Sequence, residues 1–276
     1  MNEIKKEITE MLFQSHGIDI SKYDDDFIGK SILRRIQHNN CANEKDYISF
    51  FRESNIEGGL FLDSLFINYS EFFRNSLTFA VLENLILPGI LLKNSNNKKK
   101  EIRIWSAACA SGQEAYSLAM LLTEHKSAEG KMINFRIFAT DYSEAQVTQA
   151  QQVQFQPVAL NNLNLKRMTQ WFKKRGENYI VKPELKERID FSVFDLSCEN
   201  HSCPPNSIYG DFDIVLCANL LFYYNAEYRK KIMDKARHCL SKGGYVITGE
   251  TEREIMLRYN FEEVYTQSCI FRKIGD

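Results

Sequence analysis

Apolar residues recur at helical spacing through the first quarter of the chain. Two sets each repeat every four positions: Ile4, Ile8 and Leu12, and then Ile28, Ile32 and Ile36. The segment 19–26 between them is rich in aspartate, a residue that favours turns and helix caps. This periodicity predicts that residues up to about position 75 are helical, with a further amphipathic segment at 46–52.

The pattern changes at Ile102, where short apolar runs begin to alternate with helical stretches. The runs that predict strands are 102–107, 135–140, 191–193, 212–217 and 245–248, with a last β-rich run at 264–271. Helical patterns occupy 114–122, 144–151 and 226–240. This alternation is typical of an α/β fold with a doubly wound, mainly parallel sheet.

Residues 153–188 fit the alternation poorly. Residues 176–178 have the composition of a hairpin loop, and the short apolar run 179–181 follows them. We predict a small, partly β insert that stands off the main sheet. The lysine-rich stretch 93–100 indicates a solvated connection, so we place a helical N-terminal domain and linker at 1–92 and an α/β domain at 93–276.

Charge and hydropathy exclude several classes of function. Lysine and arginine number 35 against 36 acidic residues, and this balance gives no support for nucleic-acid binding. The N-terminus lacks the apolar core of a signal peptide, and the longest apolar run, 79–92, is interrupted by Glu83, Asn84 and Pro88. We therefore expect a cytoplasmic protein without membrane insertion.

The seven cysteines lack the regular spacing of a disulfide scaffold. Cys109 and Cys217 lie in apolar runs and are expected to be reduced core residues. Cys198, His201 and Cys203 resemble part of a metal site, but a fourth ligand and a recognised spacing are missing. We expect no metal.

Two segments near the predicted carboxyl ends of strands carry candidate chemistry. After the run at 102–107 come small residues, Gly112 and a helix that begins near Glu114, which suits either a tight turn or a ligand-binding loop. No G-x-G-x-x-G or Walker A loop is present. Asp141 follows the next strand, where an acid binds a ribose diol or caps the following helix.

A third segment, 212–224, is a buried run followed by polar and aromatic residues. Asn219 follows the strand, and its amide both donates and accepts hydrogen bonds. From spacing alone, Tyr223 suits a reacting centre and the core equally well.

Together these segments resemble the CheR family of protein-glutamate methyltransferases, and the match covers most of the chain. Residues 31–36 (SILRRI) resemble its RR-I helix, and 68–74 (NYSEFFR) its N-x-T-x-F-F-R signature. Residues 106–120 are similar to S-A-x-x-S-T-G-E-E-P-Y-S-L-A-M, and 139–141 match A-T-D. Residues 216–224 are similar to F-C-R-N-V-L-I-Y-F, and 242–252 to P-G-G followed by G-x-S-E.

The resemblance implies methylation of glutamate side chains on chemotaxis receptors, with S-adenosylmethionine as methyl donor and S-adenosylhomocysteine as product. It implies a class I methyltransferase-like α/β domain at 93–276 that binds the donor, with a β-subdomain inserted at about 153–188. The implied partner is the cytoplasmic domain of a methyl-accepting receptor, and we expect a monomer.

The family motifs also assign residues. The cofactor pocket would be lined by Asn68, Ser70, Arg74, Glu114, Asp141, Asp195, Leu196, Ala218 and Asn219. Arg74 and Tyr223 would lie nearest the transferred methyl and are the implied catalytic residues. Lys30, Arg34 and Arg35 would face the acidic receptor, although a solvated helix face explains them equally well.

The chain departs from the family pattern at several positions. Ser70 replaces threonine, Gln113 replaces an acid, Asp195 replaces asparagine and Ala218 replaces an arginine. These changes keep two alternatives open: a degenerate cofactor-binding regulator, and a methyltransferase for another protein or a small molecule. The single glycine in the apparent hairpin, Gly176, weighs against docking of a receptor's C-terminal peptide on the insert.

Overall fold

The structure is a computed structural model that describes residues 2–65, 70–96, 101–125, 130, 132–198 and 200–274. The chain divides into two compact units, Met1–Ile67 with Phe222–Lys231, and Asn68–Leu221 with Ile232–Asp276. This division differs from the boundary predicted after residue 92. The reason is that Phe79, Leu82 and Ile86 pack into the same core as the sheet residues Ile102 and Ile104.

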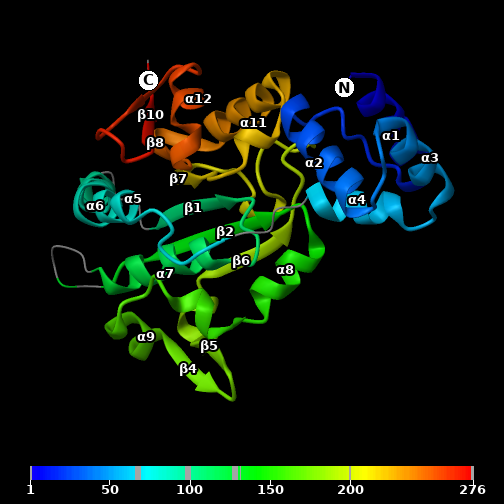
Figure 1. Cartoon of the computed structure of the whole chain (residues 1–276). Coiled ribbons are helices and arrows are strands. Elements are labelled where there is room, and N and C mark those ends of the chain that lie inside the picture. Colours follow the sequence, from blue (N-terminus) through cyan, green and yellow to red (C-terminus); the bar gives the residue numbers. More distant parts are fainter. Residues whose placement is uncertain are drawn as a thin grey trace. The chain divides into compact units, whose positions relative to one another are not determined.

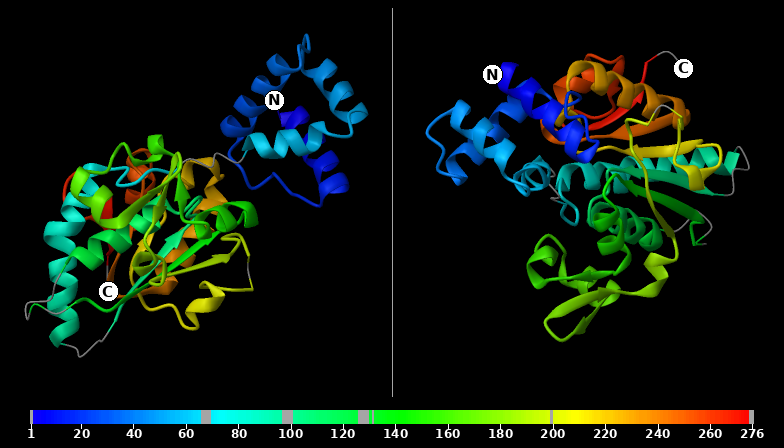
Figure 2. Two further views of the ribbon diagram at one scale, coloured as in Figure 1. Left: turned by 90° about the horizontal axis from the view of Figure 1, so that it is seen from below. Right: turned by 90° about the vertical axis from the view of Figure 1, so that its right-hand side faces the viewer.

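The helical unit contains α1 (Asn2–His16), α2 (Asp25–His38), α3 (Glu44–Glu53) and α4 (Glu57–Leu65). Its core includes the apolar residues whose periodicity predicted helices, such as Ile8, Ile28 and Ile32, which are fully buried. The Asp24 side chain accepts a hydrogen bond from the backbone N–H of Asp26 and caps α2, as the aspartate-rich segment predicted. Figure 2 shows the helices of this unit grouped together.

The α/β unit is built on a sheet with the strand order β6-β2-β1-β7-β8-β10-β9 (Figure 1). The strands are β1 (Ile102–Ala107), β2 (Phe135–Asp141), β6 (Ile189–Val193), β7 (Phe212–Leu216), β8 (Leu240–Ile247), β9 (Phe261–Glu263) and β10 (Ile270–Lys273). β10 is antiparallel to β8 and β9, and the other neighbouring pairs are parallel. The predicted doubly wound, mainly parallel sheet is confirmed.

One predicted strand is wrong. The run 264–271 contains the turn of a hairpin and the start of its second strand, because β9 ends at Glu263 and β10 begins at Ile270. Gln267 and Cys269 between them have φ angles of 62° and 56°, in the left-handed region, which interrupts a regular strand.

Helices flank this sheet. They are α5 (Ser76–Val81), the π-helical η1 (Leu82–Ile86), α6 (Leu87–Asn96), α7 (Gln113–Glu124), α8 (Glu144–Gln151), α11 (Ala226–Cys239) and α12 (Arg253–Leu257), with short turns at η3 (Pro205–Ser207), η4 (Leu221–Tyr223) and η5 (Glu250–Glu252). Figure 1 shows α7 and α8 beside β2 and β6, which they contact. The run Ser76–Asn94 is long and apolar enough to cross a membrane by composition. This is weak evidence, because core helices of soluble proteins pass the same test.

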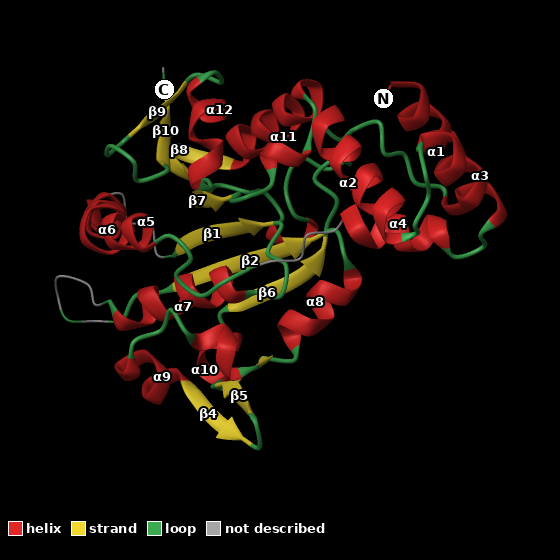
Figure 3. Cartoon of the chain, in the orientation of Figure 1, coloured by secondary structure: helices red, strands yellow, loops and turns green. Residues whose placement is uncertain are grey.

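The predicted insert is present as a small antiparallel sheet with the order β3-β5-β4. It consists of β3 (Gln154–Phe155), η2 (Pro157–Leu160), α9 (Leu165–Trp171), β4 (Phe172–Arg175), β5 (Asn178–Val181) and α10 (Pro183–Lys186). Gly176 has a φ of 61° in the turn between β4 and β5, a conformation that favours glycine. Figure 3 shows β4 and β5 standing apart from the main sheet.

The cysteines are placed partly as expected. Cys109 and Cys217 are free and buried. Cys203 forms a disulfide with Cys239, which the sequence did not predict because the partners are 36 positions apart. Among the residues that the structure describes, no three His, Cys, Asp or Glu side chains gather as a metal site.

Candidate active site

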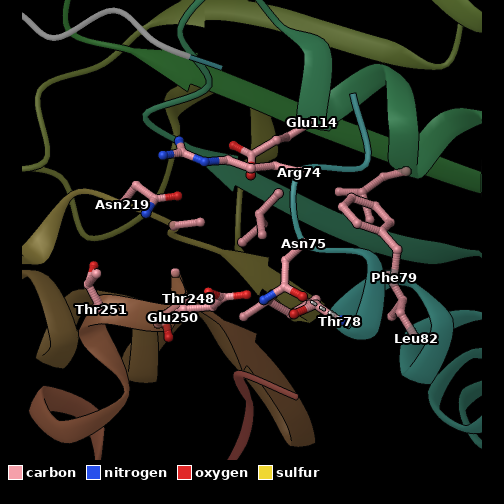
Figure 4. Close-up of a pocket in the computed structure, with 15 residues that line it drawn as sticks. Arg74, Asn75, Thr78, Phe79, Leu82, Glu114, Asn219, Thr248, Glu250 and Thr251 are labelled. Carbon is pink, nitrogen blue, oxygen red and sulfur yellow. Dashed lines mark hydrogen bonds between the residues drawn. The ribbon is translucent and has the colours of Figure 1, made fainter. Parts of the chain in front are cut away.

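A pocket of about 220 Å³ lies in the α/β unit, at the carboxyl ends of β7 and β8 and beside α5. Ligands of doubly wound proteins bind at this edge of the sheet. The lining residues are Arg74, Asn75, Thr78, Phe79, Leu82, Glu114, Leu118, Leu216, Ala218, Asn219, Ile247, Thr248, Gly249, Glu250 and Thr251. Figure 4 shows the side chains of Arg74, Glu114 and Asn219 near one another in this pocket.

Arg74 is presented by a short segment that is anchored on both sides. The preceding residues, Phe72 and Phe73, are buried, and the N–H of Phe73 donates to the Ser117 hydroxyl at 3.0 Å. The following residue, Asn75, caps α5 by accepting a hydrogen bond from the N–H of Thr78 at 3.1 Å. The backbone that carries Arg74 is therefore held firmly beside the pocket.

Glu114 lies in the first turn of α7, and its side chain is buried against the pocket. Burial raises the pKa of Glu114 to about 7, because the charged form is poorly solvated there. The positive charge of Arg74 lowers that pKa, and the negative charge of Glu252 raises it further. Glu114 therefore changes its charge near neutral pH, and a cationic ligand would favour its ionised form.

The loop between β1 and α7 has a strained backbone. Ala108 and Ala110 have φ angles of 56° and 46°, in the left-handed region that alanine seldom adopts. Gly112 has a φ of 88°, and a Cβ there would lie 3.0 Å from the Cβ of Ala150. Strain of this kind persists where the surrounding structure enforces it, often at a ligand site.

Asp141 holds this loop. Its Oδ2 accepts a hydrogen bond from the N–H of Ala110 at 2.8 Å, and its Oδ1 accepts one from the N–H of Ser143 at 2.9 Å. Burial raises the pKa of Asp141, while these N–H donors oppose the rise. Asp141 therefore supports the loop and the turn before α8, whose N-cap is Ser143, and its binding of a ribose stays a prediction.

Glu252 is a buried residue that supports the site without lining the pocket, and the sequence analysis assigned it no role. Its Oε1 accepts from the N–H groups of Leu220 and Leu221 at 2.6 and 2.5 Å. Its Oε2 accepts from those of Asn219 and Gly249 at 2.8 and 2.7 Å. Burial raises the pKa of Glu252, and the four donors lower it. The carboxylate thus joins the turns that follow β7 and β8, both of which line the pocket.

Gly249 is required for this junction. A Cβ at Gly249 would lie 2.4 Å from the Asn219 amide nitrogen and 3.1 Å from the Asn219 backbone nitrogen. The sequence signal for Glu252 was its place at the end of the family's G-x-S-E motif, which gave no role for its carboxylate.

The structure brings Arg74, Glu114, Ala218 and Asn219 together around one pocket, as the family motifs implied. Asp141 ends β2, and Asp195 follows the neighbouring parallel strand β6 at the same edge of the sheet. They are not among the residues that line this pocket.

Other predicted cofactor residues are placed as follows. Asp195 accepts hydrogen bonds from the N–H and the hydroxyl of Ser197, both at 2.7 Å, and Leu196 is buried. Ser70 has a buried hydroxyl without a hydrogen-bond partner among the described residues. Asn68 lies outside the described residues.

Tyr223 belongs to the helical unit. Its carbonyl accepts a hydrogen bond from the N–H of Asp24 at 2.8 Å, and its ring centre lies 4.8 Å from that of Phe27. These contacts pack the partly buried Tyr223 against the core of that unit, and its catalytic role stays a prediction.

The basic residues of α2 divide into two groups. Lys30 and Arg34 are exposed. Arg35 instead forms a two-pronged ion pair with Glu57, which is 1% exposed and also accepts a hydrogen bond from Tyr47 at 2.8 Å. We therefore correct the assignment of Arg35 to a receptor-facing surface, because its guanidinium neutralises a buried carboxylate.

The pocket suits S-adenosylmethionine, which carries an amino-acid end and a sulfonium cation. Arg74 supplies donors for a carboxylate, and Glu114 and Glu250 supply negative charge. Thr248 lines the pocket, and its hydroxyl is buried without a partner among the described residues. A buried polar atom of this kind indicates a place where a ligand completes the hydrogen bonding.

Comparisons with known proteins identify the family. A family model described as the CheR methyltransferase, SAM binding domain, matches residues 68–270. The chain is 33% identical over 195 residues to the chemotaxis protein methyltransferase Cher2 of Pseudomonas putida, covering 69% of this chain and 68% of that protein. It is 28% identical to the chemotaxis protein methyltransferase of Borreliella burgdorferi, covering 99% and 96% of the two chains.

Among solved structures, the chain is similar to a putative S-adenosylmethionine-dependent methyltransferase of Methanococcus maripaludis. The TM-score is 0.32 and the identity is 15%, over 66% of this chain and 68% of that one. The family model spans well over half of this chain and includes every residue that lines the pocket. The chain therefore belongs to the CheR methyltransferase family.

Proposed function

We propose that this protein transfers the methyl group of S-adenosylmethionine to glutamate side chains of chemotaxis receptors, forming methyl esters. The observation that carries the proposal is the pocket in which Arg74 and Glu114 lie beside the turn at Ala218 and Asn219. The named relatives, which are chemotaxis protein methyltransferases, support the choice of substrate.

When bound, S-adenosylmethionine supplies an electrophilic methyl group. A glutamate carboxylate is ionised at neutral pH, so the protein has no need to remove a proton from its substrate. The work of the site is then to hold the two reactants close and aligned. The planar guanidinium of Arg74 is suited to orienting a carboxylate, because its N–H donors lie in one plane.

The remaining residues receive roles by the same proposal. Glu114 balances the positive charge of the cofactor, and Asp141 accepts hydrogen bonds from its ribose. Ser70, Asp195 and Asn219 contribute further polar contacts, Leu196 and Ala218 contribute apolar surface, and Asn68 and Tyr223 are retained from the family motifs.

For the receptor, we propose that Lys30 and Arg34, which are exposed on α2, attract its acidic cytoplasmic domain. Such an enzyme would work as a monomer in the cytoplasm, where that domain of the receptor lies.

A second candidate is a regulator that binds the cofactor without turning it over. The observation that favours it is Ala218, which lines the pocket where the family pattern has an arginine. Loss of that cation removes a donor from the site. The two candidates differ in turnover and agree in cofactor binding.

The test is transfer of radiolabelled methyl from S-adenosylmethionine to receptor-rich membranes, followed by mild base. We expect base-labile label on receptor bands, and about 100-fold less with Arg74→Ala if Arg74 aligns the reactants. The matched control is Arg136→Ala, a partly exposed arginine in β2 whose partner is Asp190. Cofactor binding without label would favour the regulator, and full activity of Arg74→Ala would contradict the assigned site.

A further inference from the structure

The insert holds the segment that carries Arg74. The ring of Phe72 is fully buried and lies between two aromatic residues of the insert. Its centre is 4.9 Å from that of Phe155 in β3 and 5.5 Å from that of Phe172 in β4, both nearly edge-to-face. This arrangement is the preferred one for aromatic pairs, so Phe72 has a defined place against the small sheet.

Phe73 is held by a different contact with the insert. The guanidinium carbon of Arg167, in α9, lies 4.3 Å from the centre of the Phe73 ring. Phe79 contacts the same ring, at 4.9 Å between centres. The backbone of Phe73 has a φ of 49°, a conformation that a bulky residue keeps only where its surroundings enforce it. Arg167 thus helps to enforce the turn that directs the next residue, Arg74.

Arg167 itself is fixed. Glu124, at the end of α7, accepts two contacts at its Oε2: the Arg167 Nε lies at 2.9 Å and the Arg167 Nη2 at 2.8 Å. The same Nη2 also lies 3.4 Å from the carboxylate of Glu83 in η1. Glu124 also accepts a hydrogen bond from the indole N–H of Trp171 at 2.8 Å. The side chain of Arg167 is only 15% exposed, so a partly desolvated cation is held over the Phe73 ring.

We propose that Arg167 is a positioning residue for Arg74, and that the insert serves as a clamp that sets where the Arg74 guanidinium lies in the pocket. The clamp consists of Phe155 and Phe172 against Phe72, and Arg167 against Phe73. This inference rests on the proposed function, since it requires that Arg74 contacts the cofactor or the substrate. Figure 2 shows the small sheet at the margin of the α/β unit, apart from the main sheet.

A purely structural role for Arg167 makes a different prediction. If Arg167 only stabilised the α/β unit, its removal would lower the free energy of unfolding and would affect turnover independently of Arg74. If it acts through Arg74, its removal has no further effect once the Arg74 guanidinium is absent. Non-additivity of the two changes separates these roles.

The experiment is a double-mutant cycle of Arg167→Ala and Arg74→Ala in the full chain. The readouts are kcat for receptor methylation and the Kd for S-adenosylmethionine measured by calorimetry. We expect Arg167→Ala to lower kcat by about 10- to 100-fold, the effect of a misplacement of roughly 1 Å. We expect the same change to leave kcat and Kd unaltered, within about twofold, in the Arg74→Ala background.

The matched control is Arg188→Ala. The guanidinium of Arg188 also lies over a phenylalanine ring, 5.6 Å from the centre of Phe135, but this contact is at the start of β6. We expect wild-type kcat and Kd for this variant. Equal reductions of kcat by Arg188→Ala and Arg167→Ala would overturn the inference. It would also be overturned if the reductions of kcat by Arg167→Ala and Arg74→Ala multiplied in the double variant.

Two further outcomes keep the inference and the proposed function distinguishable. If Arg74→Ala leaves kcat and Kd unchanged, the proposed site itself fails. If Arg167→Ala does not fold, Arg167→Lys replaces it in the cycle, because lysine keeps the charge beside Glu124 and loses the planar contact with Phe73. We expect a lower kcat for folded Arg167→Lys, and a wild-type kcat would overturn the clamp.

Discussion

Glu252→Gln should destabilise the α/β unit although it removes a buried charge. The glutamine has nearly the same shape, but one carboxylate oxygen becomes an NH₂ group, which is a donor. In the native protein one oxygen serves Leu220 and Leu221 and the other serves Asn219 and Gly249. Whichever way the amide points, two buried N–H groups face another donor and lose their acceptor.

The magnitude follows from those two lost bonds. A buried donor left unsatisfied costs about 1–3 kcal/mol. Burial raises the pKa of Glu252, so the charged form is itself poorly solvated, and its removal offsets part of this cost. We expect a net loss of roughly 2–4 kcal/mol in the free energy of unfolding. For a domain of this size, each kcal/mol lowers Tm by about 2–4 °C.

The assay is urea unfolding followed by tryptophan fluorescence. The chain has two tryptophans, Trp105 and Trp171, and both belong to the α/β unit, so the signal reports on that unit alone. The control is Glu254→Gln, two residues away, whose side chain is 75% exposed. It should change the free energy of unfolding by less than about 0.5 kcal/mol. A Glu252→Gln variant as stable as this control would refute the reasoning.

Three other outcomes are expected. The pKa of Glu114 is raised from 4.5 to about 7, so its contribution should lower the free energy of unfolding by about 3 kcal/mol as pH rises from 4.5 to 7. Glu114→Gln should abolish that decline, as measured by urea unfolding at several pH values. The same dependence of the free energy of unfolding on pH in the variant and the wild type would contradict it. Asp141→Asn should raise the Kd for S-adenosylmethionine about 10- to 100-fold in calorimetry, because its amide keeps one acceptor oxygen, and either the N–H of Ala110 in the loop or that of Ser143 then faces an NH₂ donor. A change in Kd below twofold would be inconsistent with this. Arg35→Ala should lower the free energy of unfolding by about 3–5 kcal/mol, because Glu57 stays buried without its cation. Unfolding is followed by far-ultraviolet circular dichroism, and the control Arg34→Ala, at an exposed position, should have little effect. Equal stability of these two arginine variants would show that the ion pair is unimportant.

Most of the fold could be predicted from local patterns. The strand at Ile102–Ala107 and the helix at Glu144–Gln151 were placed to the residue, because a short, largely apolar run buried on both faces and a helical stretch after it leave direct traces in the sequence. The hairpin of β9 and β10 was missed, because the β-forming residues Val264, Tyr265 and Thr266 continue past the end of β9 and no glycine or proline marks the turn.

The candidate site could be predicted where its residues lie in motifs at strand ends. Arg74, Glu114, Ala218 and Asn219 were assigned by resemblance, and the pocket brings these residues together. Asn75 and Thr248 were missed, since neither type nor spacing distinguishes a pocket-lining residue from a surface one.

The sequence by itself therefore determined the order of strands and helices, the family and the motif residues of the pocket. Only the tertiary structure decided that Glu252 joins the turns after β7 and β8, that Arg35 neutralises Glu57, and that Arg167 covers Phe73. Each of these contacts joins residues more than 20 positions apart in the sequence. Most of the residues involved are charged, and charged residues are equally common on a solvated surface. Periodicity records which face of an element is buried, but the partner of a buried charge is chosen by packing between distant elements.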